Sequence, residues 1–361
     1  MREAVTIHGM HPGWRMAIFG WTAWAAATLA LAQQAPFPAE PAASWKPAWE
    51  LSLRADRISD PDLRREDLQL RLRWTVQGEV LRLEAGTRSA LGSDGNRFNP
   101  YRWDQQPSNG SQIDVAHVDA TGVTAAAFGT GRLGFQENTL LASQALWDRN
   151  LRFLGASMSG GLRSPGGGVQ EAGIRMEAGR VRTVLGGDMR LAAAQMVLKL
   201  DTGPLSWTAH GGRWTLAWDR GEERQEAVPG HEADPRQHLG LGAWGAGVRW
   251  NSPTPLEAHW FRARNSGTGE DSEEFQLSAG SRARPWRPQL MYTWQRLSAT
   301  GTLYPVNGDE WWFYRAARGP RVDLALPLSG QWLVSITWLR QREDGYGYSV
   351  QRKMLNVMKR F

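Results

Sequence analysis

Residues 67–76 read Asp-Leu-Gln-Leu-Arg-Leu-Arg-Trp-Thr-Val, and this stretch decides the fold. Every second residue from Leu68 to Val76 is aliphatic or aromatic, and the residues between them are charged or polar. A two-residue period is that of a β-strand whose two faces lie in different surroundings. Similar segments recur from about Trp49 to the end of the chain. The pattern predicts an all-β protein whose strands separate an apolar medium from water.

The N-terminal residues have the order of a secretory signal peptide. Arg2 and Arg15 precede an apolar run at 16–29, which ends in the small-residue site Ala30-Leu31-Ala32. The alternative is a membrane anchor, but the run is shorter than the ~20 residues that a spanning helix needs. The predicted organisation is a signal peptide at 1–32, a periplasmic tail at 33–46 and an outer-membrane β-barrel at 47–361.

Composition narrows the class of protein further. The chain has no cysteine, which excludes disulfides and thiolate metal sites, and 20 of its 361 residues are tryptophan although the mean hydropathy is −0.48. A membrane barrel places indoles at its two interfaces and keeps a wet interior, which fits both numbers. The net charge of +6 favours anionic solutes and lipopolysaccharide phosphates as partners, while export argues against nucleic acid. We therefore expect a Gram-negative outer-membrane location.

Short polar turns alternate with longer Gly-, Asn- and Asp-rich connections, as in outer-membrane barrels. The predicted fold is a transmembrane antiparallel up-and-down β-barrel of about sixteen strands, with 14 to 18 as the range. Within 205–219 the apolar phase reverses around Gly211-Gly212, which predicts a β-bulge there. The predicted strands are 47–57, 66–76, 79–89, 111–121, 123–131, 150–160, 169–182, 188–201, 205–219, 237–250, 255–264, 273–284, 289–299, 310–327, 332–343 and 347–358.

Several segments within 47–345 resemble the alginate-export type of outer-membrane porin. They are Phe128-Gly129-Thr130-Gly131-Arg132-Leu133-Gly134-Phe135-Gln136-Glu137-Asn138, then Trp147, then Phe153-Leu154-Gly155, and finally Pro285-Trp286-Arg287-Pro288-Gln289-Leu290. The resemblance implies an outer-membrane channel, and it does not imply alginate as the substrate.

Strand parity predicts a group of arginines that point into the barrel from three consecutive strands. Because neighbouring strands lie about 4.8 Å apart, their guanidinium groups would form one basic wall that contacts carboxylates, phosphates or sulfates. The alternative is that they form structural ion pairs with Glu50, Glu84, Glu171 and Glu177. The predicted wall consists of Arg54, Arg71, Arg73, Arg82 and Arg88.

The connection 132–149 is the predicted constriction, because its leucines, Phe135 and Trp147 are too apolar to remain in water. If it folds into the barrel, polar side chains of this segment would surround the narrowest point. These are Arg132, Gln136, Glu137, Asn138, Asp148 and Arg149.

A second set of arginines shares the parity of outward-facing tryptophans near the predicted outer rim. These side chains would either bind lipopolysaccharide phosphates or extend to the interface as ordinary snorkelling residues. The set is Arg262, Arg264, Arg296, Arg340 and Arg342.

The predicted function is passive passage of small or oligomeric anionic solutes, including oligosaccharides, without catalysis, cofactor or metal. Residues 129–134 match a dinucleotide fingerprint in letters, but they open no predicted helix. One alternative is a narrow or plugged barrel that serves as a structural or surface-binding protein. Another is a secreted β-sandwich, against which the tryptophan distribution argues. The sequence leaves the oligomeric state open.

Overall fold

The computed structural model describes the chain from residue 44 onward, with gaps. The described ranges are 44–59, 62–92, 110–147, 151–164, 168–182, 188–218, 239–282, 284–303, 316–329, 331–345 and 347–361. The predicted signal peptide lies outside them, as does the predicted tail up to residue 43. Residues 44–46, assigned to that tail, belong instead to the first strand.

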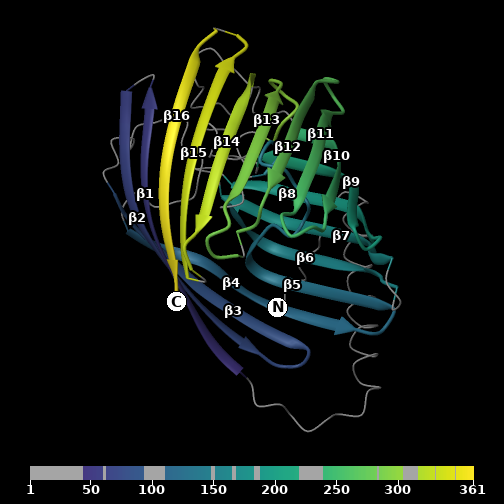
Figure 1. Ribbon diagram of the computed structural model, residues 1–361. Helices are drawn as coiled ribbons and strands as arrows, with labels where there is room; N and C mark the ends of the chain where they lie inside the picture. Colours follow the sequence, from purple (N-terminus) through teal and green to yellow (C-terminus); the bar gives the residue numbers. More distant parts are fainter. Residues whose placement is uncertain are drawn as a thin grey trace, which may run out of the picture.

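Sixteen antiparallel strands form one closed barrel, which confirms the predicted fold class (Figure 1). Each strand pairs with its neighbours in sequence, and β1 closes on β16 from Glu50 opposite Arg360 to Ile58 opposite Arg352. The strands are β1 Ser44–Ser59, β2 Asp62–Gln77, β3 Leu81–Gly92, β4 Gly110–Val123, β5 Ala127–Glu137, β6 Arg152–Leu162, β7 Val169–Arg182, β8 Asp188–Asp201, β9 Leu205–Trp218, β10 Leu239–Trp250, β11 Leu256–Asn265, β12 Asp271–Ala279, β13 Gln289–Leu297, β14 Ala317–Pro327, β15 Trp332–Glu343 and β16 Ser349–Arg360.

The two ends of the barrel differ. One end, here the short-turn end, carries brief connections such as 78–80, 124–126 and 202–204, and the C-terminus lies there (Figure 1). The other end, the loop end, carries most of the long connections, including 138–151. No helix among the described residues is long and apolar enough to cross a membrane.

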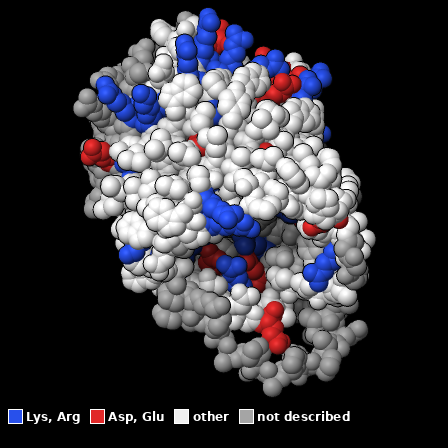
Figure 2. Space-filling view, in the orientation of Figure 1, with Lys and Arg blue, Asp and Glu red and all other residues white. Residues whose placement is uncertain are grey.

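Alternation along each strand separates an outer from an inner face. On β2 and β3, Leu68, Leu81 and Leu83 are 41 to 56% exposed on the outside, whereas Gln69 and Glu84 are buried inside. Figure 2 shows the result on one side of the barrel, where uncharged atoms form a broad band and charged groups gather mainly above it. The 67–76 stretch therefore has the two faces that its sequence predicts.

The predicted bulge in β9 is wrong. The strand pairs in unbroken register with β8 and β10, from Leu205 opposite Trp250 to Leu216 opposite Leu239. The apolar phase changes because Trp207 faces outward at 44% exposure, whereas Trp214 and Leu216 face inward and are fully buried. The sequence reversal marks an apolar inner wall, not an extra residue.

The strand β5 is longer than predicted and takes in part of the expected loop. Arg132, Gln136 and Glu137 belong to β5, so the connection begins only at Asn138. Gly134 permits this continuation, because it adopts φ = +134° and a Cβ there would lie 2.3 Å from the Ala116 carbonyl oxygen. The glycine-rich sequence, from which the strand was predicted to end at residue 131, instead lets β5 continue and approach β4 closely.

The segment 138–147 folds into the barrel and packs on the inner wall, as its apolar residues predict. Leu146 and Trp147 are 0% and 4% exposed, and the Trp147 ring lies 6.1 Å from that of Trp214. The apolar cluster extends over the inner faces of β6 to β11 and β13 near the loop end and includes Leu140, Leu151, Phe153, Val181, Met189, Leu191, Leu241, Phe261 and Leu297. This part of the interior is a dry core rather than a water-filled passage.

Candidate functional site

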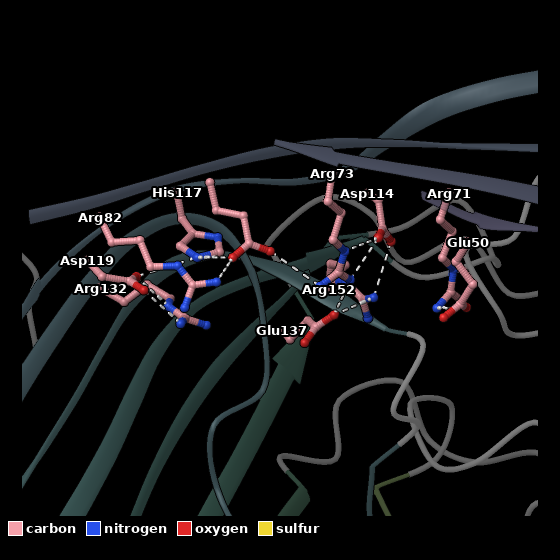
Figure 3. Close-up of polar contacts among 11 residues, drawn as sticks. Glu50, Arg71, Arg73, Arg82, Asp114, His117, Asp119, Arg132, Glu137 and Arg152 are labelled. Atoms are coloured by element: carbon pink, nitrogen blue, oxygen red, sulfur yellow. Dashed lines mark hydrogen bonds and ion pairs between the residues drawn. The ribbon is translucent and has the colours of Figure 1, made fainter. Parts of the chain in front are cut away.

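A network of ionisable side chains crosses the inner wall opposite the dry core (Figure 3). Five arginines, five carboxylates and one histidine from β1 to β6 form it, so positive and negative groups balance when the histidine is neutral. The charged network consists of Glu50, Arg71, Arg73, Arg82, Glu84, Asp114, His117, Asp119, Arg132, Glu137 and Arg152.

Asp114 occupies the centre of this network because β4 contains a bulge. Gly86 pairs with Val115 and Thr87 with Ile113, so Asp114 has no partner residue on β3. An extra residue in one strand redirects the side chain next to it. Ile113 is 59% exposed on the outer face, whereas Asp114 is 0% exposed and points inward.

Two arginines neutralise this buried carboxylate. Arg73 Nη2 lies 2.9 Å from Asp114 Oδ2, and Arg152 Nη2 lies 3.2 Å from Asp114 Oδ1. The same Arg152 atom lies 2.8 Å from Glu137 Oε1, and Arg73 also contacts Glu137. Four charged groups from four strands thus hold the wall together where the chain enters and leaves the folded-in segment.

A second group of contacts lies nearer the short-turn end. Arg132 binds Asp119 through two nitrogens, Nε at 2.6 Å and Nη2 at 2.9 Å. His117 Nε2 lies 3.5 Å from Asp119 and 4.0 Å from Glu84, whose carboxylate also contacts Arg82. Arg73 Nη1, 3.3 Å from Glu84, joins this group to the contacts around Asp114.

The five residues of the predicted basic wall lie on the predicted strands, but they do not form one basic surface. Arg73 and Arg82 are ion-paired in the network, and Arg88 is 1% exposed. Arg54 and Arg71 line a cavity, where Arg71 lies 3.9 Å from Glu50 and Arg54 donates to the Met354 sulfur.

The alternative of structural ion pairs is correct for two of its four acids. Glu50 and Glu84 do pair with arginines of the predicted wall. Glu171 instead binds Arg175 and Lys199, and Glu177 accepts hydrogen bonds from Thr139 of the folded-in segment.

A cavity of about 400 Å³ lies between the charged network and β14 to β16. Its charged lining is unequal, with six arginines and three carboxylates. The arginines are Arg54, Arg71, Arg152, Arg282, Arg321 and Arg360, and the carboxylates are Glu50, Glu137 and Asp323. Figure 2 shows a hollow in the lower half of the barrel where groups of both signs lie together.

A second cavity of about 420 Å³ lies against β9 to β13 and shares Arg282 and Arg321 with the first. Its lining is less charged and includes residues 141–144 of the folded-in segment, His210, Phe261 and Met291. Gln144 Oε1 accepts a hydrogen bond from Arg321 Nη1 at 3.2 Å, and Asp323 binds Arg321 from the other side. The folded-in segment therefore reaches across the interior to β14 and separates the two cavities.

The residues of the predicted constriction do not all meet at one point. Glu137 lines the first cavity, but Arg132 is paired with Asp119. Gln136 is buried, donates a hydrogen bond to the Gly155 carbonyl and accepts one from the Ser157 hydroxyl. Asn138 accepts a hydrogen bond from the Leu140 backbone. Asp148 and Arg149 lie outside the described residues.

Sequence reasoning missed Asp114, Arg152 and the Arg321–Asp323 pair. Parity places Arg152 on the outer face with Leu154, but the chain leaves the dry core here, and Leu151, Arg152 and Phe153 are all buried in succession. The inward position of Asp114 depends on the bulge, and no glycine at residues 113–115 signals that bulge in the sequence. Arg321 and Asp323 alternate in step with the inward Ala325, so the alternation of β14 could have predicted that both side chains face the barrel interior.

No group of three or more His, Cys, Asp or Glu side chains that could hold a metal ion occurs in the part of the chain that the structure describes.

Comparison with solved structures finds outer-membrane porins of the same barrel architecture. Salmonella typhi OmpF matches with a TM-score of 0.55 at 9% identity over 90% of this chain and 100% of that one. Pseudomonas putida OprB matches with 0.55 at 9% identity over 88% and 94%. A loop-deleted OmpT of Vibrio cholerae matches with 0.51 at 12% identity over 89% and 100%. At these identities the likeness concerns the fold.

No family model and no curated protein sequence matches the chain.

Proposed function

We propose that this chain is an outer-membrane channel that passes small anionic solutes by diffusion, without catalysis. The observation that carries the proposal is the cavity between the charged network and β14 to β16, where six arginines face three carboxylates. A positive excess in a narrow, partly desolvated passage attracts anions and holds back cations. The porin architecture and the uncharged outer band support placement in the outer membrane.

The route is narrow because much of the loop-end interior is solid. The folded-in segment and its contact with Arg321 leave the passage to run along the charged network, past Arg71, Arg152 and Glu137. Such a route suits small solutes that carry carboxylate or phosphate groups, which arginine binds with two hydrogen bonds. Passage of oligosaccharides, and the specific resemblance to alginate-export porins, remain predictions from sequence.

Neutralising two cavity arginines is expected to weaken anion selectivity. In the Arg54→Gln/Arg71→Gln variant, the ratio of anion to cation permeability should fall by at least about twofold, because two of the six cavity cations are removed. The measurement is the reversal potential of single channels in a planar bilayer under a salt gradient. The matched control is Arg213→Gln/Arg264→Gln, which removes the same charge from exposed strand positions outside both cavities.

An unchanged reversal potential in the cavity variant would refute the selectivity mechanism.

The dry core favours a second candidate, a barrel closed by its own folded-in segment that serves a structural or surface-binding role. Inserted wild-type protein that shows no conductance steps would favour that candidate.

A further inference from the structure

A row of outward-facing side chains crosses the five strands β11 to β15 near the loop end of the barrel, and four of these strands contribute an arginine. Strand register places Arg262 opposite Glu273, Glu273 opposite Arg296, Arg296 opposite Arg318, and Arg318 opposite Arg342. These four arginines, here the arginine row, alternate along their strands with buried inward residues, so they lie on the outer face.

The arginine row brings like charges together. Side chains directly opposite each other on antiparallel strands are about 5 Å apart at Cβ, and like charges in such pairs are destabilising. Arg296 and Arg318 form one such pair, and Arg318 and Arg342 form another. A bound anion at these positions would turn the repulsion into attraction.

Carboxylates offset only part of this charge. Glu273 lies 3.7 Å from Arg262 and 3.5 Å from Arg296, and Asp344 lies 3.2 Å from Arg318. The outer face of β11 to β16 carries two described carboxylates on its strands near the loop end, Asp271, which lies 2.6 Å from Arg262, and Glu273, and the adjoining turns add Glu270 and Asp344. It carries seven described cations there, namely Arg262, Arg264, Arg296, Arg318, Arg340, Arg342 and Lys353.

The arginine row begins where the apolar surface ends. Trp260 and Trp294 each lie two residues before a member of the row on the same outer face, and Trp338 lies two residues before Arg340. Tryptophan marks the boundary between hydrocarbon and headgroups in membrane proteins. Figure 2 shows the same arrangement, with Lys and Arg gathered along the upper rim above the uncharged band. The guanidinium groups therefore lie at headgroup height.

We propose that the arginine row binds the phosphate groups of a glycolipid of the outer leaflet, the lipid A part of lipopolysaccharide. A phosphate offers several acceptor oxygens to planar guanidinium forks, and Arg296, Arg318 and Arg342 present three such forks side by side. The acyl chains of the same lipid would contact the uncharged band below. This inference rests on the proposed outer-membrane location, but not on conduction through the barrel.

The test is binding of fluorescently labelled, bis-phosphorylated lipid A to refolded protein in detergent micelles, followed by anisotropy. The Arg296→Gln/Arg318→Gln/Arg342→Gln variant should bind about tenfold more weakly, since the charge-assisted bonds are lost. Because the substitutions relieve repulsion, we expect the variant to fold, which its heat-resistant electrophoretic mobility and its β-sheet circular dichroism would verify.

The matched control is Arg163→Gln/Arg249→Gln/Arg287→Gln, which removes three cations at the short-turn end and should leave lipid A binding unchanged. A dephosphorylated lipid A should bind wild type as weakly as the intact lipid binds the triple variant. The proposal would be overturned if wild type and triple variant bound lipid A equally well. It would also be overturned if wild type bound dephosphorylated lipid A as tightly as intact lipid A. Displacement of lipid A by millimolar inorganic phosphate would instead assign the site to a free anion. Because this assay involves no conduction, it can fail while the channel proposal stands, or succeed while that proposal fails.

Discussion

Replacing Arg152 with methionine is expected to lower the free energy of unfolding by about 3 kcal/mol, the lower end of the usual cost of removing one partner from a buried ion pair. Arg152 is 2% exposed and contacts both Asp114, which is fully buried, and Glu137. Arg73 would still bind Asp114 Oδ2, so the loss should fall short of complete unfolding. The measurement is the urea dependence of folding in phospholipid vesicles.

Two further variants separate charge from packing. Asp114→Asn combined with Arg152→Met should recover part of the lost stability, because the uncompensated charge at the bulge is then gone. Arg249→Met, at an exposed position near the short-turn end, should change the free energy of unfolding by less than about 0.5 kcal/mol. A loss for Arg152→Met no larger than that of Arg249→Met would show that the network is not structural.

Replacing Leu140–Trp147 with a short Gly-Ser linker is expected to raise the single-channel conductance severalfold. This segment occupies the interior near the loop end and separates the two cavities, so its removal joins them into one wider passage. Planar-bilayer recordings of step size give the result. The same variant should be less stable, because Trp214 and Met189 would then face water.

A smaller change serves as the control for this variant. Gln144→Ala removes the hydrogen bond to Arg321 but keeps the bulk of the segment, so it should leave the mean conductance near that of wild type. A linker variant with wild-type conductance would mean that ions pass by a route that the segment does not narrow.

Much of the architecture could be predicted from the sequence, because alternation is a local property. The sixteen strands, the asymmetry of the two ends and the outward position of leucines such as Leu68 follow from period-two patterns and turn residues. The folded-in position of Leu146 and Trp147 also followed, since a connection so apolar needs a surface to pack on.

The errors arise where tertiary contacts override local alternation. Trp214 appeared to break the phase of β9 because a barrel interior was expected to be polar, whereas the folded-in segment makes this part dry. The inward positions of Arg152 and Asp114 were not predicted, because Arg152 lies at the irregular start of β6 and Asp114 lies at the bulge of β4. The expected basic wall became a balanced network because Asp114 and Glu137 join it from the bulge of β4 and the end of β5, beside Glu50 and Glu84, whose pairing with these arginines was the alternative prediction.

The dry core has a consequence for the chain before the barrel closes. Strand β8 reads Leu-Ala-Ala-Ala-Gln-Met-Val-Leu over 191–198, and its apolar residues serve both the inner core and the outer face. A strand of a membrane barrel with a polar interior has a single apolar face. Strand β8 has two, because Gln195 is the one polar residue among the eight at 191–198. An apolar segment without charge or proline is prone to aggregate when it is exposed to water. In the unfolded chain, β8 is therefore a segment that a chaperone would have to protect from aggregation while it is still in water.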